Sequence, residues 1–120
     1  MKTILIAEDD PASRELLAEI LRAAGYGVVE AGDGAKAIIL LEHEPPDAAI
    51  LDIQMPIQDG FAVLQYVRQH MAAPQPLVIA VSAHALLGER ERALQMGFDE
   101  YLTKPVEIAL LRQRLHDLLP

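Results

Sequence analysis

Apolar and polar residues alternate along this chain in two kinds of segment. The first kind is a short, mostly apolar run, which is typical of a strand buried on both faces of a sheet. The second kind carries apolar residues three or four positions apart, which is typical of a helix with one buried face. Each apolar run predicts one strand. The runs are Thr3–Ala7, Gly27–Ala31, Ala48–Leu51, Leu77–Val81 and Tyr101–Thr103.

A helical pattern follows each predicted strand. Asp10 and Pro11 suit the cap and the first position of the first helix, and Gly25 suits its end. Five strands that alternate with five helices predict an open α/β sandwich, a parallel sheet with helices on both faces. The later helices are predicted to begin at Asp33, Asp59-Gly60, Ala85 and Pro105, with Pro45-Pro46 ending the second and Gly97 the fourth. The apolar helix positions are Leu17, Ile20, Leu21, Ala24, Ala37, Ile38, Leu41, Phe61, Leu64, Val67, Ile108, Leu111, Leu115 and Leu118.

Reactive side chains stand where the predicted strands end. Glu8 and Asp9 follow the first strand, Asp52 ends the third, Ser82 ends the fourth and Lys104 follows the fifth. The carboxyl ends of parallel strands share one edge of the sheet, and open α/β folds bind ligands at that edge. We therefore expect these residues, which are distant in sequence, to converge on one site.

Three carboxylates in one small site would repel one another, so the site needs raised pKa values or a cation. The group contains only oxygen donors, which favours a hard ion such as Mg²⁺. Asp52 ends the central strand and is the candidate nucleophile, because an aspartate can form an aspartyl-phosphate. Glu8 and Asp9 are then the metal-holding pair. Lys104 and Ser82 would stabilise the transferred phosphoryl group by positioning and electrostatics.

Composition narrows the possible classes of function. The 120 residues suffice for one domain with a sizeable core, and with two Phe and three Tyr that core must be aliphatic. A formal net charge of −8 argues against direct binding of nucleic acid or of an anionic membrane. The lack of cysteine excludes disulfides and thiolate chemistry. No signal-peptide pattern and no apolar stretch of roughly 20 residues is present, so we expect a cytoplasmic domain that does not insert into membranes.

Four motifs in order carry a family resemblance that covers essentially the whole chain. They are Ile4-Leu5-Ile6-Ala7-Glu8-Asp9-Asp10, Asp52-Ile53-Gln54-Met55-Pro56 with Asp59-Gly60, Val81-Ser82-Ala83, and Tyr101-Leu102-Thr103-Lys104-Pro105. The sequence resembles the receiver domain of bacterial two-component response regulators, in a single-domain form that occupies residues 1–120. The resemblance implies a flavodoxin-like sheet with strand order 2-1-3-4-5.

The resemblance also implies a role for each residue of the site. Asp52 would accept the phosphoryl group, and Asp9 would bind Mg²⁺ directly, with Glu8 acting nearby through water. The main-chain carbonyl of Gln54 would be a further metal ligand. Lys104 would pair with the phosphoryl group, and its bond to Pro105 would be cis.

Other residues would couple phosphorylation to a change of surface. Ser82 would bond a phosphoryl oxygen and Tyr101 would rotate inward, which would alter the face of the fourth helix, fifth strand and fifth helix. Gln54 and His84 would tune the lifetime of the phosphate. The expected partners are a histidine kinase or a histidine phosphotransfer protein and a downstream protein, and the domain would not be an enzyme in the ordinary sense.

Some residues have a purely structural explanation, and other functions remain as alternatives to this hypothesis. Asp10 is predicted to act only as a helix cap, and His43, His70 and His116 as surface residues. A phosphatase of the haloacid-dehalogenase type would need an aspartate where Gln54 stands. A degenerate receiver that serves as a scaffold is the other alternative, although the five reactive residues are intact. The chain leaves no room for an output domain, so it would signal by protein binding or phosphorelay, unless it comes from a larger hybrid kinase or regulator.

Overall fold

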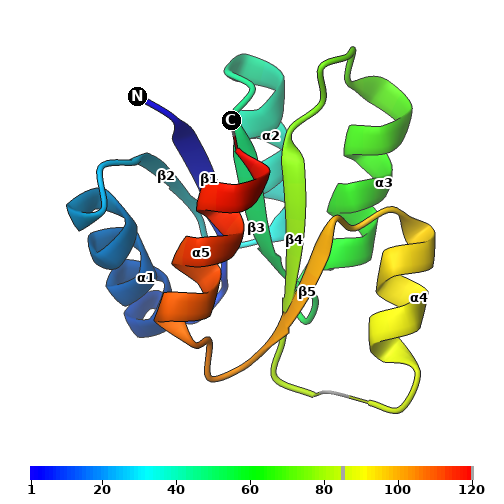
Figure 1. Cartoon of the computed structure of the whole chain (residues 1–120). Helices are drawn as coiled ribbons and strands as arrows, with labels where there is room; N and C mark the ends of the chain where they lie inside the picture. The colour runs from blue at the N-terminus through cyan, green and yellow to red at the C-terminus, as the bar shows by residue number, and fades with distance from the viewer. Residues whose placement is uncertain (85, 120) are drawn as a thin grey trace.

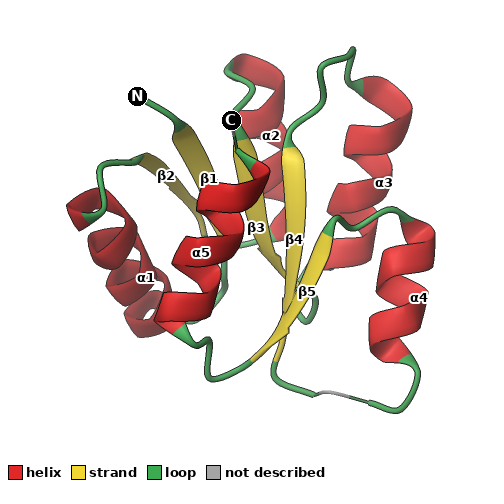
Figure 2. Ribbon diagram, viewed as in Figure 1, coloured by secondary structure: helices red, strands yellow, loops and turns green. Residues whose placement is uncertain are grey.

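The fold is an open parallel sheet between two layers of helices (Figures 1 and 2). The structure is a computed structural model, and it describes residues 1–84 and 86–119. The strands pair in the order β2-β1-β3-β4-β5, all parallel, which confirms the expected topology. The strands are β1 Thr3–Ala7, β2 Gly27–Ala31, β3 Ala48–Asp52, β4 Leu77–Ser82 and β5 Glu100–Thr103. The helices are α1 Pro11–Ala23, α2 Gly34–His43, α3 Gly60–His70, α4 Glu89–Met96 and α5 Ile108–Leu118.

Each face of the sheet has its own apolar core. Successive side chains of a strand point to opposite faces. Leu5 and Leu51 therefore pack with residues of α2, α3 and α4, whereas Ile4, Ile6 and Ile50 pack with residues of α1 and α5. Figure 1 shows the same division, with α1 and α5 on one side of the sheet. All five residues of β3 are buried, as expected for the central strand. Among the described residues, no helix has both the length and the apolar character to cross a bilayer.

Aspartates cap three of the helices, and each stands where the sequence predicted that a helix begins. Asp10, Asp33 and Asp59 each accept a hydrogen bond from the main-chain N–H three residues later. Such caps satisfy donors that have no partner inside the helix, and removing one costs about 1 kcal/mol. The caps also fix where each helix starts relative to the strand that precedes it.

Two predicted helix starts were wrong. The predicted start of α4 at Ala85 lies outside the described residues, but α4 begins only at Glu89, after Gly88 adopts a left-handed conformation with φ 81°. α5 begins at Ile108 and not at Pro105, because the chain uses residues 104–107 to leave the sheet edge before it turns back over the face. Leu118 was also misplaced on the buried face of α5. It lies in the last turn and is 43% exposed, while Leu119 packs against the core.

Ile57, in the loop between β3 and α3, has an unfavourable backbone conformation. Its φ is 69°, where a β-branched side chain crowds the following carbonyl, and its side chain is 77% exposed. We expect Ile57→Asn to stabilise the protein by about 1 kcal/mol, since asparagine tolerates this conformation and little apolar burial is lost. That gain corresponds to a rise in Tm of about 4 °C, measured by thermal unfolding.

Ile39 supplies the control for that measurement. It is another exposed isoleucine, at 53%, but it lies within α2. Ile39→Asn should give no gain, because asparagine is a poorer helix former than isoleucine. Equal changes in Tm in the two variants would show that the effect of Ile57→Asn comes from surface polarity and not from the backbone conformation.

Candidate functional site

Three carboxylates converge at the carboxyl edge of the sheet, as the strand-end pattern predicted. Glu8 and Asp9 follow β1, Asp52 ends β3, and one oxygen of each lies within 4.8 Å of the others. Glu8 and Asp52 are buried and Asp9 is exposed. Gly60 lets α3 start directly behind the cluster, because a Cβ there would lie 2.7 Å from the carbonyl oxygen of Asp52. The acids therefore form one concentrated negative site, open on the side of Asp9.

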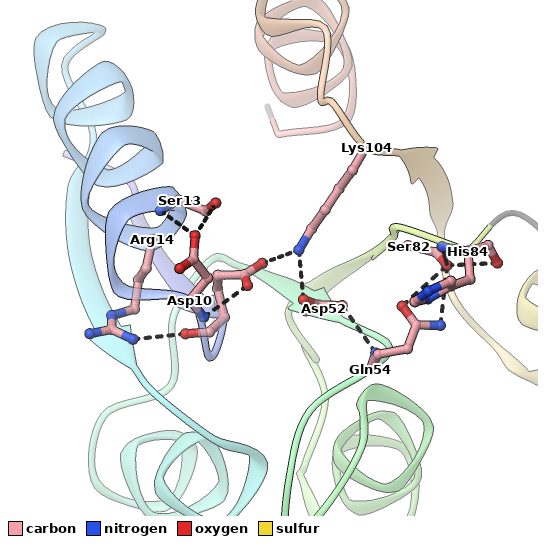
Figure 3. A network of polar contacts seen from close by, with 9 residues as sticks. Asp10, Ser13, Arg14, Asp52, Gln54, Ser82, His84 and Lys104 are labelled. Carbon is pink, nitrogen blue, oxygen red and sulfur yellow. Dashed lines mark hydrogen bonds and ion pairs between the residues drawn. The ribbon is translucent and has the colours of Figure 1, made fainter.

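Lys104 reaches into this cluster from the loop after β5. Its Nζ donates to Glu8 Oε2 at 2.5 Å and to Asp52 Oδ2 at 2.7 Å, so the ammonium bridges the two buried acids (Figure 3). Burial disfavours the charged ammonium, but its hydrogen bonds to Asp52 and Glu8 outweigh that effect and raise the pKa of Lys104. Its peptide bond to Pro105 is cis, as the resemblance implied.

Burial and the neighbouring lysine act on the pKa of Glu8 in opposite directions. Burial raises the pKa of Glu8 above its ordinary value; the hydrogen bond from Lys104 lowers it and nearby Asp52 raises it. One lysine faces three acids, so the cluster keeps an excess of negative charge. The donors are all carboxylate or carbonyl oxygens, which are the ligands preferred by a hard divalent cation such as Mg²⁺. The residues present therefore fit a magnesium site.

Gln54 connects Asp52 to Ser82. The Gln54 main-chain N–H donates to Asp52 Oδ1 at 3.0 Å, and its side-chain amide donates to Ser82 Oγ at 3.3 Å. Ser82 is fully buried, and its hydroxyl also accepts the main-chain N–H of His84 at 3.2 Å. Ser82 thus stands beside the carboxylates, as predicted, but is engaged by Gln54 and His84 rather than by an acid. His84 is exposed at the rim, and the other three histidines are exposed as well.

Tyr101 points inward in this structure. It is only 4% exposed, and its hydroxyl donates to Glu89 Oε1 in the first turn of α4 at 2.5 Å. Burial, together with the carboxylate of Glu89, raises the pKa of Tyr101. Arg90 donates from Nη1 to the Tyr101 carbonyl at 3.2 Å. The amino end of α4 is therefore tied to β5 by polar contacts that the sequence analysis did not anticipate.

Asp10 acts as the helix cap that was predicted. Its carboxylate accepts the main-chain N–H and the hydroxyl of Ser13, and these bonds lower its pKa. Arg14 was missed. Its Nη1 donates to the carbonyl oxygen of Glu8 at 2.8 Å (Figure 3). A cation near the amino end of a helix opposes the helix dipole, and that mismatch was the available signal that Arg14 has another partner.

An apolar cavity of about 520 Å³ adjoins the acids on the α1 side. Leu16, Leu17 and Ile20 of α1 line one wall, and Val106 and Ile108 line the wall after β5. Glu8, Asp52 and Lys104 also line the cavity, so a molecule that enters it can approach the carboxylate of Asp52. The arrangement places the buried carboxylate of Asp52 beside a lysine and beside two further carboxylates that fit a hard cation.

Comparison with known proteins gives a consistent result. The family model described as the response regulator receiver domain matches residues 4–116. The chain is 38% identical over 112 residues to the sensor histidine kinase RcsC of Salmonella typhimurium. The aligned region is 93% of this chain and 12% of that protein. The chain thus spans about an eighth of that relative's length.

Solved structures show the same fold. The Francisella response regulator 1452 receiver domain has a TM-score of 0.90 and 30% identity, covering 99% of this chain and 97% of that one. The receiver domain of the sensor histidine kinase PA1611 from Pseudomonas aeruginosa has a TM-score of 0.88 and 33% identity, covering 98% and 97%. That structure is described with a magnesium ion coordinated in the active site cleft.

Proposed function

The chain belongs to the response regulator receiver family of two-component systems, and we propose that it accepts a phosphoryl group on Asp52 in a Mg²⁺-dependent reaction. The observation that carries the proposal is the bridge from Lys104 to Glu8 and Asp52 within a cluster of three acids. A buried carboxylate beside a lysine and a hard-cation site has the parts that an aspartyl-phosphate needs.

The chemistry would be a displacement at phosphorus. An Asp52 carboxylate oxygen would attack the phosphorus of the donor, an O–P bond would form, and the donor's bond to phosphorus would break. With acetyl phosphate the leaving group is acetate, and with phosphohistidine it is the imidazole, which then takes up a proton. The Lys104 ammonium would then contact the negatively charged phosphoryl oxygens and stabilise them. Glu8, Asp9, Asp52 and the Gln54 main-chain carbonyl would hold Mg²⁺, which when bound would neutralise phosphoryl and carboxylate charge.

The direct test is intact-protein mass spectrometry after incubation with acetyl phosphate. We expect a mass increase of one phosphoryl group with Mg²⁺ and no increase after chelation. An increase that survives complete removal of divalent metal would contradict the magnesium requirement. No increase in either condition, with magnesium binding intact, would favour the alternative of a degenerate receiver that serves as a scaffold.

The proposed response to phosphate is a switch of the α4–β5–α5 face through Ser82 and Tyr101. α4 buries only Ala93, and polar contacts hold its amino end, so a small change at Ser82 can move it. Gln54 and His84, which contact the Ser82 hydroxyl, are proposed to tune the lifetime of the phosphate. Exposed Leu86, Leu87 and Leu94 would supply apolar contacts to a downstream protein.

We expect Ser82→Ala to retain phosphoryl uptake but to lose most of the conformational response. The variant removes the hydroxyl that would bond a phosphoryl oxygen, while Asp52 and Lys104 keep their contacts. The measurement is the change in amide chemical shifts of α4, β5 and α5 on phosphorylation. Wild-type-sized shifts on that face in Ser82→Ala would contradict the role given to Ser82.

The proposed phosphodonor is a histidine kinase or a histidine phosphotransfer protein. Similarity to RcsC, a sensor histidine kinase, supports a place in a phosphorelay within or beside a larger hybrid kinase. In such a relay the phosphate would pass between Asp52 and a histidine of the partner. The domain would assist its own phosphorylation without turning over a substrate. A cytoplasmic location belongs to the same proposal, because a chain without cysteine suits a reducing compartment.

A further inference from the structure

Arg14 links the acid cluster to parts of the fold outside it. From α1, its Nη1 donates to the carbonyl oxygen of Glu8 at 2.8 Å, and its Nε lies 3.5 Å from Glu30 Oε1 on β2. The Arg14 side chain is 19% exposed. A partly buried guanidinium with two fixed acceptors has little freedom to reorient. Arg14 therefore joins α1, β2 and the loop after β1 at one point.

The carbonyl that Arg14 holds lies between the two predicted metal-holding acids. It belongs to the peptide that joins Glu8 to Asp9, so the bond from Arg14 sets the orientation of that peptide. The rest of the loop is fixed by the Glu8 main-chain N–H, which donates to the Ala31 carbonyl at 3.1 Å. The Asp10 main-chain N–H donates to Glu8 Oε1 at 3.1 Å. Arg14 supplies the cationic donor in this set.

Glu30 orients Arg14 and also contacts a second arginine. Arg22 lies with Nη2 3.4 Å from Glu30 Oε2 and donates to the Val28 carbonyl at 3.3 Å. The Arg22 side chain is 49% exposed, and its main-chain acceptor is on β2, away from the acids. Arg22 thus shares the carboxylate partner of Arg14 without touching the metal-binding loop, which makes it a matched control.

We infer that Arg14, held by Glu30, is a positioning residue that sets the affinity of the acid cluster for Mg²⁺. The inference rests on the proposed function, since it concerns the same cation site. Residues behind a set of metal ligands orient those ligands, and changing them typically lowers metal affinity about 10- to 100-fold. In this site the orienting residue acts on the backbone between Glu8 and Asp9.

A simple charge effect would act in the opposite direction. Removing a positive charge near three acids makes the site more negative and should tighten Mg²⁺ binding. Glu30 does not cancel that effect, because loss of the Arg14 charge leaves the Glu30 carboxylate without this partner. Arg14→Lys separates the two explanations. It keeps the charge but cannot reproduce the planar guanidinium that contacts the Glu8 carbonyl and Glu30 together.

The experiment is a titration of the full chain with magnesium chloride, followed by amide chemical shifts of the acid cluster. We expect Arg14→Lys and Arg14→Gln to raise the Kd for Mg²⁺ about tenfold, and Arg22→Gln to leave it within about twofold. Glu30→Asp should raise it less, since the bond from Arg14 to Glu8 remains. Because Glu30→Asp keeps the charge and shortens only the side chain that contacts Arg14, it also tests the inference should the Arg14 variants fail to fold. Thermal unfolding without metal verifies that each variant is folded at the titration temperature.

Three other outcomes are distinguishable. An unchanged Kd in Arg14→Lys with tighter binding in Arg14→Gln would overturn the inference in favour of a pure charge effect. Equal losses in the Arg14 and Arg22 variants would overturn it in favour of a general loss of stability around β2. If the wild-type chain itself does not bind Mg²⁺, the proposed function fails, and the inference falls with it.

Discussion

Asp52→Asn should show no phosphoryl mass increase with acetyl phosphate and Mg²⁺, a loss of more than about 1,000-fold in the rate of uptake. An amide is not a competent nucleophile for this displacement, and it weakens the cation site by one charge. The fold should persist, because asparagine has nearly the same volume and its amide oxygen can still accept the Gln54 main-chain N–H. Intact-protein mass spectrometry measures the loss, and thermal unfolding verifies the fold.

Asp10→Asn is the matched control for Asp52→Asn. Asp10 stands next to the acid pair, but it is exposed and its carboxylate caps α1 through Ser13. Asparagine caps helices about as well as aspartate, so phosphoryl uptake should be close to wild type. A phosphoryl adduct on Asp52→Asn would mean that another group accepts the phosphate. Asp9 would be the first candidate, because it is the exposed carboxylate of the cluster.

The parts of the fold that could be predicted are those that burial dictates. A strand buried on both faces must be mostly apolar, and Ala48–Leu51 of β3 is a continuous apolar run for that reason. The starts of α4 and α5 could not be predicted, because neither helix has a side-chain cap hydrogen bond. α4 buries only Ala93, so its apolar pattern is too weak to locate its first turn.

The acid cluster could be predicted because topology alone brings it together. Strands β1 and β3 are parallel neighbours, so the strand ends that carry Glu8, Asp9 and Asp52 lie side by side. The contacts between Arg14 and Glu8 and between Tyr101 and Glu89 depend on long side chains that cross between elements. Such contacts follow from the exact placement of α1 and α4 over the sheet. The spacing of residues along the chain does not encode that placement.

Lys104→Met should change phosphoryl uptake and magnesium affinity in opposite directions. Methionine keeps the length of the side chain but removes the ammonium that contacts Glu8 and Asp52. Uptake should fall about 100-fold or more, because a positioned charge no longer stabilises the phosphoryl oxygens. Mg²⁺ should bind about tenfold more tightly, because no cation competes for the same oxygens. The metal-free protein should lose about 2 kcal/mol of stability, since two buried acids lose their partner.

The opposite signs make this prediction hard to satisfy by accident. General damage to the site would weaken both uptake and magnesium binding, and a merely structural lysine would leave uptake unchanged once Mg²⁺ restores stability. Lys2→Met is the control, because Lys2 is exposed and precedes β1, at the edge of the sheet opposite the acids, and the change should alter neither quantity. Lys104→Arg should recover part of the uptake only, since a guanidinium has the charge but not the compact ammonium that fits between Glu8 and Asp52. Uptake at the wild-type rate in Lys104→Met would show that Lys104 only neutralises the resting acids and does not act on the phosphoryl group.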